Sequence, residues 1–387
     1  MYAARPRDAS SARRKAGAIA VLVLATITAA CSSNVTTDAA TSTTKPAAAG
    51  TTAGTAPPST GSAATASTAP PGSGATAASP TAKATGPAKP SPGCGASTVK
   101  AVEAEKRTMD VAGAERFYLL TTPAAHDGTT PLPLVLDFHG LAEGAQVHTQ
   151  MSEFGALAQK EGFVVAFPNG TGQPVKWDAN TRSNPNHDVE FVDQLLDQLG
   201  SQLCIDTSRV YATGLSYGAI MSSFLTCVRA DRFAAVAPVA GLTVPEACSP
   251  SRPMPALTFH GTADPILKFN GGVDLGSLGG TTDSGPTTTK PPADLNGAGY
   301  PEAVAKWAAR NGCKPDPTDT KVTENVIHRV YDCPAGAAVE FYIVLGGGHA
   351  WPGSAFSKSI EKVVGPTTFD ISATPLAWQF FQRFQLP

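Results

Sequence analysis

The decapeptide VYATGLSYGA, residues 210–219, constrains the fold of this chain more than any other stretch. A short apolar run ends in GLSYG, and apolar residues then recur at helical spacing, which predicts a strand, a tight turn and a helix. The pattern G-x-S-x-G needs that context, because its serine sits in a strained turn and its glycines let other backbone pass closely. Glycine and serine are abundant here, so a chance match in a loop is the alternative. The strand and helix on either side favour Ser216 as a nucleophile.

Short apolar runs alternate with amphipathic stretches along the rest of the chain. Strands are predicted at 116–121, 134–138, 163–167, 210–212, 234–239, 256–259 and 338–345, and helices at 149–159, 188–203, 303–310 and 375–384. This alternation predicts an α/β fold with a mostly parallel sheet covered by helices on both faces. Ligands of such sheets bind beyond the carboxyl ends of the strands.

Two residues follow predicted strands at the places where partners of a catalytic serine are expected. The strand at 256–259 runs into HGTADP, which contains Asp264, and the strand at 338–345 runs into GGGHAWPG, which contains His349. The order Ser216, Asp264, His349 is that of an α/β-hydrolase triad, in which the carboxylate orients the imidazole that takes the serine proton. An aspartate after a strand is more often a turn or capping residue. Other aspartates follow at Asp274, Asp283 and Asp294.

The other six histidines are given non-catalytic interpretations. His126, His148 and His328 are interpreted as surface residues, and His139, His187 and His260 as structural ones. Among the seven, His349 alone is late in the chain on a glycine-rich loop after a strand.

A serine hydrolase also needs N–H donors that stabilise the tetrahedral oxyanion. The turn after Ser216 supplies the N–H of Tyr217. A second donor is expected after the predicted strand that ends in LDFHGL, residues 136–141, where the N–H of Leu141 is the candidate. Trp177, Trp351 and Tyr217 are candidate walls for an aromatic acyl group or a sugar ring, although aromatic residues are more often simply packed.

The N-terminal part of the chain is expected to lie outside the fold. Basic residues precede the apolar run 16–30, which is typical of a secretory signal peptide over residues 1–30. TAAC, residues 28–31, resembles a lipobox with Thr28 in place of leucine, so Cys31 is a candidate for acylation and membrane anchoring, and ordinary cleavage is the alternative. Residues 31–93 are almost entirely Ala, Thr, Ser, Gly and Pro, which predicts a disordered linker. Residues 94–387 have the length of one catalytic domain.

Cysteine content fits an exported protein. If Cys31 carries lipid, six of the seven cysteines remain, enough for three disulfides. Two local pairs, each flanking a predicted strand–helix unit, and one pair left by elimination are predicted: Cys227–Cys248, Cys313–Cys333 and Cys94–Cys204. No cluster of cysteine and histidine suggests a metal site. The net charge of −2 and the absence of a basic stripe outside the signal segment argue against nucleic acid as a partner.

Four motifs together resemble one family of secreted esterases. FHGLAEG, GLSYGA, HGTADP and GGGHAWPG are similar to motifs of the family that includes poly(3-hydroxybutyrate) depolymerases, feruloyl and acetylxylan esterases, and LpqC-type esterase lipoproteins. The resemblance covers nearly all of residues 94–387. It implies an α/β-hydrolase fold, ester hydrolysis without a cofactor, and Ser216, Asp264 and His349 as the triad.

The resemblance leaves the substrate open between hydroxyalkanoate esters and feruloyl or acetyl esters of polysaccharides, polymeric or not. The lipobox and linker favour the LpqC-type branch, whereas the Gly/Thr/Pro-rich insert at 271–299 departs from it. Two alternatives from other classes are an acyltransferase of the mycolyltransferase type and a non-catalytic surface binding protein. The second would be expected to have lost part of the triad, which this chain retains.

Overall fold

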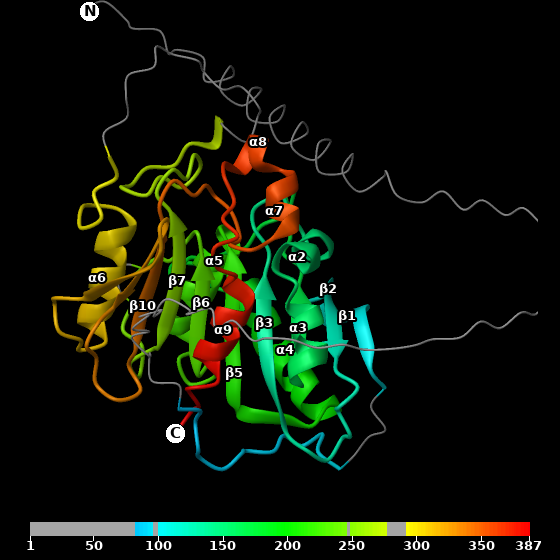
Figure 1. Cartoon of the computed structure of the whole chain (residues 1–387). Helices are drawn as coiled ribbons and strands as arrows, with labels where there is room; N and C mark the ends of the chain where they lie inside the picture. The colour runs from blue at the N-terminus through cyan, green and yellow to red at the C-terminus, as the bar shows by residue number, and fades with distance from the viewer. Residues whose placement is uncertain (1–81, 96–99, 246–247, 277–291) are drawn as a thin grey trace, which may run out of the picture.

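A computed structural model describes residues 82–95, 100–245, 248–276 and 292–387, which are built around one ten-stranded sheet (Figure 1). The strand order is β1-β2-β4-β3-β5-β6-β7-β10-β9-β8. The strands are β1 (Val102–Val111), β2 (Ala114–Thr122), β3 (Leu132–Phe138), β4 (Val164–Pro168), β5 (Ile205–Leu215), β6 (Ala235–Val239), β7 (Ala256–Gly261), β8 (Thr318–Thr323), β9 (Val326–Val330) and β10 (Val339–Val344). The helices are α2 (Ala145–Ser152), α3 (Phe154–Glu161), α4 (His187–Gln202), α5 (Tyr217–Val228), α6 (Tyr300–Arg310), α7 (Ala355–Ser359), α8 (Glu361–Val364) and α9 (Ala373–Phe381).

The centre of the sheet is parallel and its edges are antiparallel. Strands β4, β3, β5, β6, β7 and β10 run in one direction, and β2 and β9 pair antiparallel at either end of this block. Every residue of β3, β4, β6, β7 and β10 is buried, which explains their continuous apolar runs. This is the predicted α/β-hydrolase fold.

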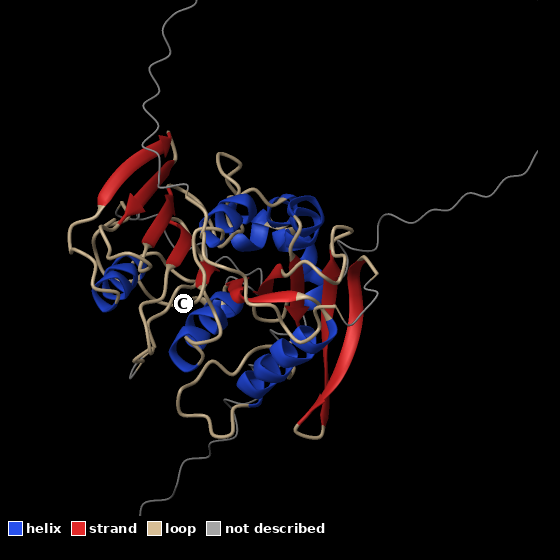
Figure 2. Ribbon diagram, turned by 90° about the horizontal axis from the view of Figure 1, so that it is seen from below, coloured by secondary structure: helices blue, strands red, loops and turns tan. Residues whose placement is uncertain are grey.

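Helices cover both faces of the sheet (Figure 2). Apolar residues of α4, α5 and α6, among them Phe191, Phe224 and Trp307, pack into the core on one face. On the other face α2, α3 and α9 contribute Met151 and Trp378 to a second core. Because both faces are closed, a substrate reaches the parallel strands only at their ends.

The composition placed the start of the folded domain at Cys94, but the domain begins earlier in the sequence. The Ala84 N–H donates to Gln382 O at 2.9 Å, and the Ser91 side chain, 4% exposed, donates to Leu203 O at 2.7 Å. Gly93 passes so close to Leu203 that a Cβ would lie 2.4 Å from its carbonyl oxygen. Small and proline-rich residues thus allow close backbone packing here, which the prediction of a linker over residues 31–93 did not anticipate.

Three disulfides, one long-range and two local, form in the pairs that the sequence predicted. They are Cys94–Cys204, Cys227–Cys248 and Cys313–Cys333. The first fixes the N-terminal segment to the beginning of β5. The signal segment and Cys31 lie outside the described residues. Within the ranges that are described, no helix is both long and apolar enough to cross a membrane.

Candidate active site

Ser216 occupies a strained turn between β5 and α5. Its φ of 58° is unusual for a residue with a side chain, and its N–H donates to Val239 O at 2.9 Å. A Cβ at Gly214 would lie 2.4 Å from Phe138 O, and one at Gly218 would lie 1.8 Å from the same oxygen. The end of β3 therefore passes where both side chains would be, and this explains the two glycines of G-x-S-x-G. The first N–H of α5, from Tyr217, has no acceptor within the helix because it opens the first turn.

Asp264 lies in the loop after β7 and is held from both carboxylate oxygens. Its Oδ2 is 2.7 Å from Nδ1 of His349, and its Oδ1 accepts hydrogen bonds from the N–H groups of Ile266 and Leu267 at 2.8 Å. The residue is 2% exposed. Burial alone would raise the pKa of Asp264, but the neighbouring imidazoles of His349 and His260 hold it below its usual range. The carboxylate is therefore charged and its orientation is fixed.

His349 follows β10, the parallel neighbour of β7. The strands are in register to their ends, where Val344 pairs with Gly261, so their carboxyl-end loops meet. A Cβ at Gly261 would lie 2.2 Å from Gly347 O, which shows how closely the loops pack. Nδ1 of His349 contacts Asp264, while Nε2 makes no hydrogen bond within the described part of the chain. One ring nitrogen therefore stays available for proton transfer.

A second histidine contacts the same carboxylate. Nε2 of His260 lies 3.2 Å from Asp264 Oδ2 and 2.8 Å from Leu267 O, and the buried ring stacks on Tyr300 at 3.6 Å between centroids. The structural interpretation of His260 agrees with this packing. His260 belongs to β7 and Asp264 follows four residues later, so the loop after β7 brings the two side chains together.

The loop after β3 lies against Ser216 and carries the N–H of Leu141, the predicted second donor. A Cβ at Gly140 would lie 3.5 Å from Ser216 Cβ. The N–H groups on either side of Leu141 are all engaged: Gly140 donates to Glu143 Oε2 at 2.5 Å, Ala142 to Val175 O at 2.8 Å, and Glu143 to Gly140 O at 3.3 Å. The Leu141 N–H donates to no group among the described residues. It therefore stays the candidate for the second oxyanion donor.

His139 braces the base of this loop, as the sequence predicted. Its Nδ1–H donates to Gly140 O at 2.7 Å, and its Nε2 accepts from the Gly170 N–H at 2.9 Å. Burial lowers the pKa of His139 to about 4, so the ring is neutral and this tautomer is fixed.

Comparisons with known proteins place the chain among esterases. The family model described as esterase PHB depolymerase matches residues 96–284. The putative esterase NocK of Nocardia uniformis subsp. tsuyamanensis is 30% identical over 287 residues, which are 71% of this chain and 81% of that protein. The chain belongs to the esterase PHB depolymerase family.

Two further proteins are similar to this member of the esterase PHB depolymerase family. Feruloyl esterase B of Piromyces equi is 30% identical over 243 residues, which are 61% of this chain but only 42% of that protein. The chain thus spans less than half the length of that relative. Acetyl xylan esterase from Aspergillus awamori, a solved structure, matches 67% of this chain and 98% of its own at 14% identity and a TM-score of 0.46.

Two aromatic residues expected to line the site belong to the core instead. Trp177 and Trp351 are each 1% exposed. Trp177 packs on His139 and donates from Nε1 to its carbonyl oxygen at 2.9 Å, and Trp351 donates to Thr374 Oγ1 at 2.9 Å. Neither ring has a face left for a substrate, so that prediction was wrong for both. Tyr217 is half-buried and remains a candidate wall.

Three histidines expected at the surface are buried or half-buried. His148 is fully buried between two carboxylates, His126 is 4% exposed, and His328 is half-buried against Glu340. The spacing around His148 matched neither a metal site nor a capping pattern, so the sequence offered no signal for its burial.

The insert at 271–299 is described only at its two ends, residues 271–276 and 292–299. These ends are joined through Asn270, whose Nδ2 donates to Asp294 O at 2.7 Å and whose Oδ1 accepts from the Asp294 N–H at 2.9 Å. The insert therefore leaves and returns close to the Asp264 loop. Asp283 lies outside the described residues.

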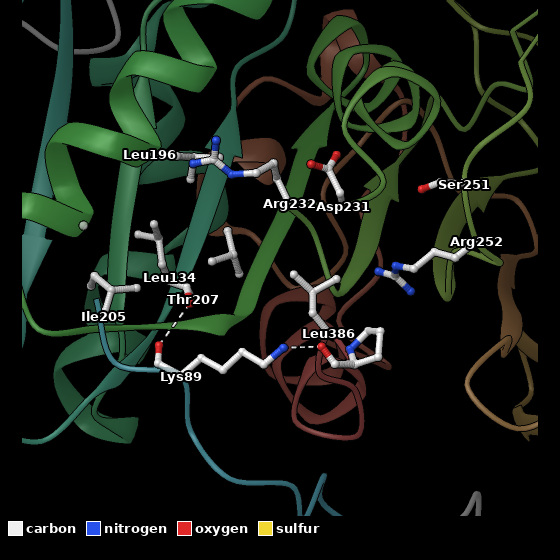
Figure 3. Close-up of a pocket in the computed structure, with 13 residues that line it drawn as sticks. Lys89, Leu134, Leu196, Ile205, Thr207, Asp231, Arg232, Ser251, Arg252 and Leu386 are labelled. Atoms are coloured by element: carbon white, nitrogen blue, oxygen red, sulfur yellow. Dashed lines mark hydrogen bonds between the residues drawn. The ribbon is translucent and has the colours of Figure 1, made fainter. Parts of the chain in front are cut away.

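A cavity of about 550 Å³ lies away from this site (Figure 3). Its lining includes Leu134 and Ile205, near the beginnings of β3 and β5, together with Lys89, Arg232 and Leu386. It therefore lies at the amino ends of the strands, whereas Ser216 follows the carboxyl end of β5. Among the described residues, no group of three or more His, Cys, Asp or Glu side chains is placed to hold a metal ion.

Proposed function

We propose that this protein is an exported serine esterase that hydrolyses carboxylic esters through an acyl-enzyme on Ser216. The 2.7 Å contact between Asp264 Oδ2 and His349 Nδ1 carries the proposal, because it joins the loops after β7 and β10 at the edge of the sheet where the strained Ser216 turn follows β5. Membership of an esterase family supports the same chemistry.

The reaction follows from the roles of these groups. His349 Nε2 takes the proton of Ser216 Oγ as the oxygen attacks the ester carbonyl, and Asp264 stabilises the resulting imidazolium. The N–H groups of Tyr217 and Leu141 stabilise the oxyanion. Collapse of the tetrahedral intermediate releases the alcohol, which takes the proton from His349. Water then attacks the acyl-enzyme with His349 as base, and the carboxylic acid leaves as Ser216 Oγ takes the proton back from His349.

The proposed substrates are hydroxyalkanoate esters and feruloyl or acetyl esters of polysaccharides. The family description supports the first class, and the likeness to feruloyl esterase B supports the second. A panel of esters that varies the acid and the alcohol separately, with release of free acid as the readout, ranks the two classes. The same assay run with a sugar acceptor measures any transfer product.

Replacing Ser216 by alanine tests the nucleophile. We expect Ser216→Ala to leave a folded domain and to lower turnover of a short-chain aryl ester by roughly a thousandfold or more, because the covalent route is lost. His349→Ala should cost about as much. Ser222→Ala, which removes a buried hydroxyl from the same helix, is the matched control and should keep near wild-type turnover. Most of the activity surviving in Ser216→Ala would show that another residue is the nucleophile.

We also propose that the protein is a lipoprotein of the LpqC type, anchored through Cys31 by the linker. Three disulfides support export, since they persist in oxidising compartments. Cys31→Ser is expected to move the protein from the membrane fraction to the soluble fraction, because acylation at this position is the proposed anchor. Fractionation with an antibody to the catalytic domain measures this. A wild-type protein that is already soluble after export would contradict the anchor.

A further inference from the structure

Three buried ionisable side chains form a hydrogen-bonded network next to the loop that carries Leu141. His148 Nε2 lies 2.7 Å from Asp137 Oδ1, and His148 Nδ1 lies 2.9 Å from Glu143 Oε1. The side chains of His148 and Asp137 are completely buried, and that of Glu143 is 8% exposed. Asp137 belongs to the end of β3 and His148 to α2, so this network connects the candidate oxyanion loop to both the sheet and a helix.

Glu143 binds both backbone groups of Gly140, the N–H and the carbonyl oxygen. The carboxylate oxygen Oε2 accepts the Gly140 N–H at 2.5 Å, and the N–H of Glu143 donates to Gly140 O at 3.3 Å. Gly140 O also accepts from His139 Nδ1 at 2.7 Å. Both groups of Gly140 thus have fixed partners: the Glu143 carboxylate holds the peptide group before Gly140, and the Glu143 N–H and the His139 ring hold the peptide group after it.

The direction of the Leu141 N–H follows from the planarity of the peptide bond. The carbonyl of Gly140 and the N–H of Leu141 belong to one trans peptide group, in which the two bonds point in opposite directions. Because Gly140 O is held on the side of Glu143 and His139, the Leu141 N–H points away from them. A rotation of this one peptide group would turn the donor away from its present direction.

Charge strengthens the hold on Gly140. Burial alone would raise the pKa of Glu143, but the charge of His148 and their hydrogen bond keep it below its usual range. An ionised carboxylate accepts a stronger hydrogen bond from an N–H than a neutral acid does. The cation of His148 therefore keeps Glu143 in the form that binds Gly140 best.

We infer that Glu143 is a positioning residue for ester turnover: by holding Gly140 it aims the N–H of Leu141 at the oxyanion. The inference rests on the proposed function, because it assigns a role within the same Ser216-dependent reaction. Glu143 acts through Gly140 and has no contact with the substrate in this role.

The test compares Glu143→Ala with Glu143→Gln on a matched pair of substrates, an aryl ester and its thionoester. Sulfur in place of the carbonyl oxygen is a poor hydrogen-bond acceptor, so the thionoester gains little from an oxyanion donor. We expect Glu143→Ala to lower kcat for the oxygen ester by about tenfold to a hundredfold, with KM little changed, since misplacement of one group by about 1 Å has costs of this size. The rate with the thionoester should fall much less, so the ratio of the two rates decreases. Glu143→Gln should recover part of the loss, because its amide oxygen can still accept from Gly140, although its NH2 group cannot accept from His148 as the carboxylate does.

Glu340→Ala is the matched control, because Glu340 is also a buried carboxylate bound to a histidine, His328, but lies on β10 with no contact to the loop. It should leave the ratio of oxygen ester to thionoester unchanged. If Glu143→Ala unfolds, Glu143→Asp replaces it, since the shorter side chain keeps the charge but draws back from Gly140, and the same fall in the ratio is expected. An unchanged ratio in the folded variant would overturn the inference.

Failure of this inference is distinguishable from failure of the proposed function. If wild type turns over esters and Ser216→Ala does not, the proposed function stands whatever the Glu143 variants do. If wild type shows no Ser216-dependent turnover, the proposed function itself is wrong and with it the inference.

Discussion

Two buried clusters of histidine and carboxylate lie at the carboxyl ends of the parallel strands, and they differ in one respect. In the first, Nδ1 of His349 contacts Asp264 and Nε2 has no hydrogen bond within the described residues. In the second, both ring nitrogens of His148 are bound, to Asp137 and to Glu143. An imidazole with both nitrogens occupied can hold a charge but cannot pass a proton to a substrate. A buried histidine–carboxylate pair is therefore a candidate for catalysis only where the second nitrogen is free.

The two clusters can be distinguished by what their variants change, turnover or stability. The pair of Asp264 and His349 should determine turnover with little effect on stability, because its histidine faces the reaction. The charges of Asp137 and His148 should mainly determine stability, because they are completely buried, and only Glu143 links this cluster to turnover, through Gly140. Variants in each cluster can confirm or break this division.

The largest effect is expected from Asp264→Asn. The amide keeps the volume of the carboxylate but cannot stabilise an imidazolium, and it can favour the wrong tautomer of His349. A loss on the order of ten-thousandfold in kcat is expected from such a change in a triad, with the melting temperature nearly unchanged. Steady-state turnover at neutral pH, with thermal unfolding of the same preparation, measures both quantities.

The controls for this variant are the aspartates of the insert. Asp274→Asn, Asp283→Asn and Asp294→Asn should each change kcat far less than Asp264→Asn does, since the 2.7 Å contact with His349 belongs to Asp264. If kcat of Asp264→Asn stays within tenfold of wild type while one of these three variants loses most of its turnover, the acid of the triad has been assigned to the wrong residue and the insert is catalytic.

The sequence predicted the parts of this molecule that local pattern determines. The turn at Ser216, the parallel strands around it and the loops that carry Asp264 and His349 follow from apolar runs and glycines, which act over a few residues. The edge strands β1, β8 and β9 were missed. Strands β1 and β8 consist almost entirely of exposed and half-buried residues, so they lack the apolar runs that marked the central strands.

Long-range packing explains the remaining differences. Trp177 and Trp351 are buried because α2, α9 and the loop after β3 cover them, and no local pattern reports which aromatic ring will be covered. His148 meets Asp137 eleven residues away across a strand–helix junction, a spacing that no helical or strand period indicates. The hydrogen bonds of residues 84–93 to the domain likewise depend on partners more than a hundred residues away.

A smaller effect, measured here on stability, is expected from His148→Gln. Burial lowers the pKa of His148, but the charges of Asp137 and Glu143 and their hydrogen bonds raise it to about 10, above the ordinary value of 6.5. The imidazolium is therefore present in the folded protein at neutral pH. Its removal leaves two buried carboxylates without a cation, and removing one partner of a buried charge pair typically costs about 3–5 kcal/mol of the free energy of unfolding.

The pH dependence of that loss separates a charged His148 from a merely well-packed one. A group whose pKa is raised on folding contributes stability that is fully present below its unfolded value and is lost as pH rises through its folded value. The gap in free energy of unfolding between wild type and His148→Gln should therefore be widest near pH 6.5 and shrink by about 1.4 kcal/mol per pH unit toward pH 10. Urea unfolding at several pH values in this range measures the gap.

His328→Gln is the control, because its partner Glu340 keeps Arg383 at 2.6 Å, and its loss of unfolding free energy should be smaller. A gap for His148→Gln that does not change with pH would mean that the ring is neutral in the folded protein, and the contrast between the two clusters would then rest on hydrogen bonding and not on charge.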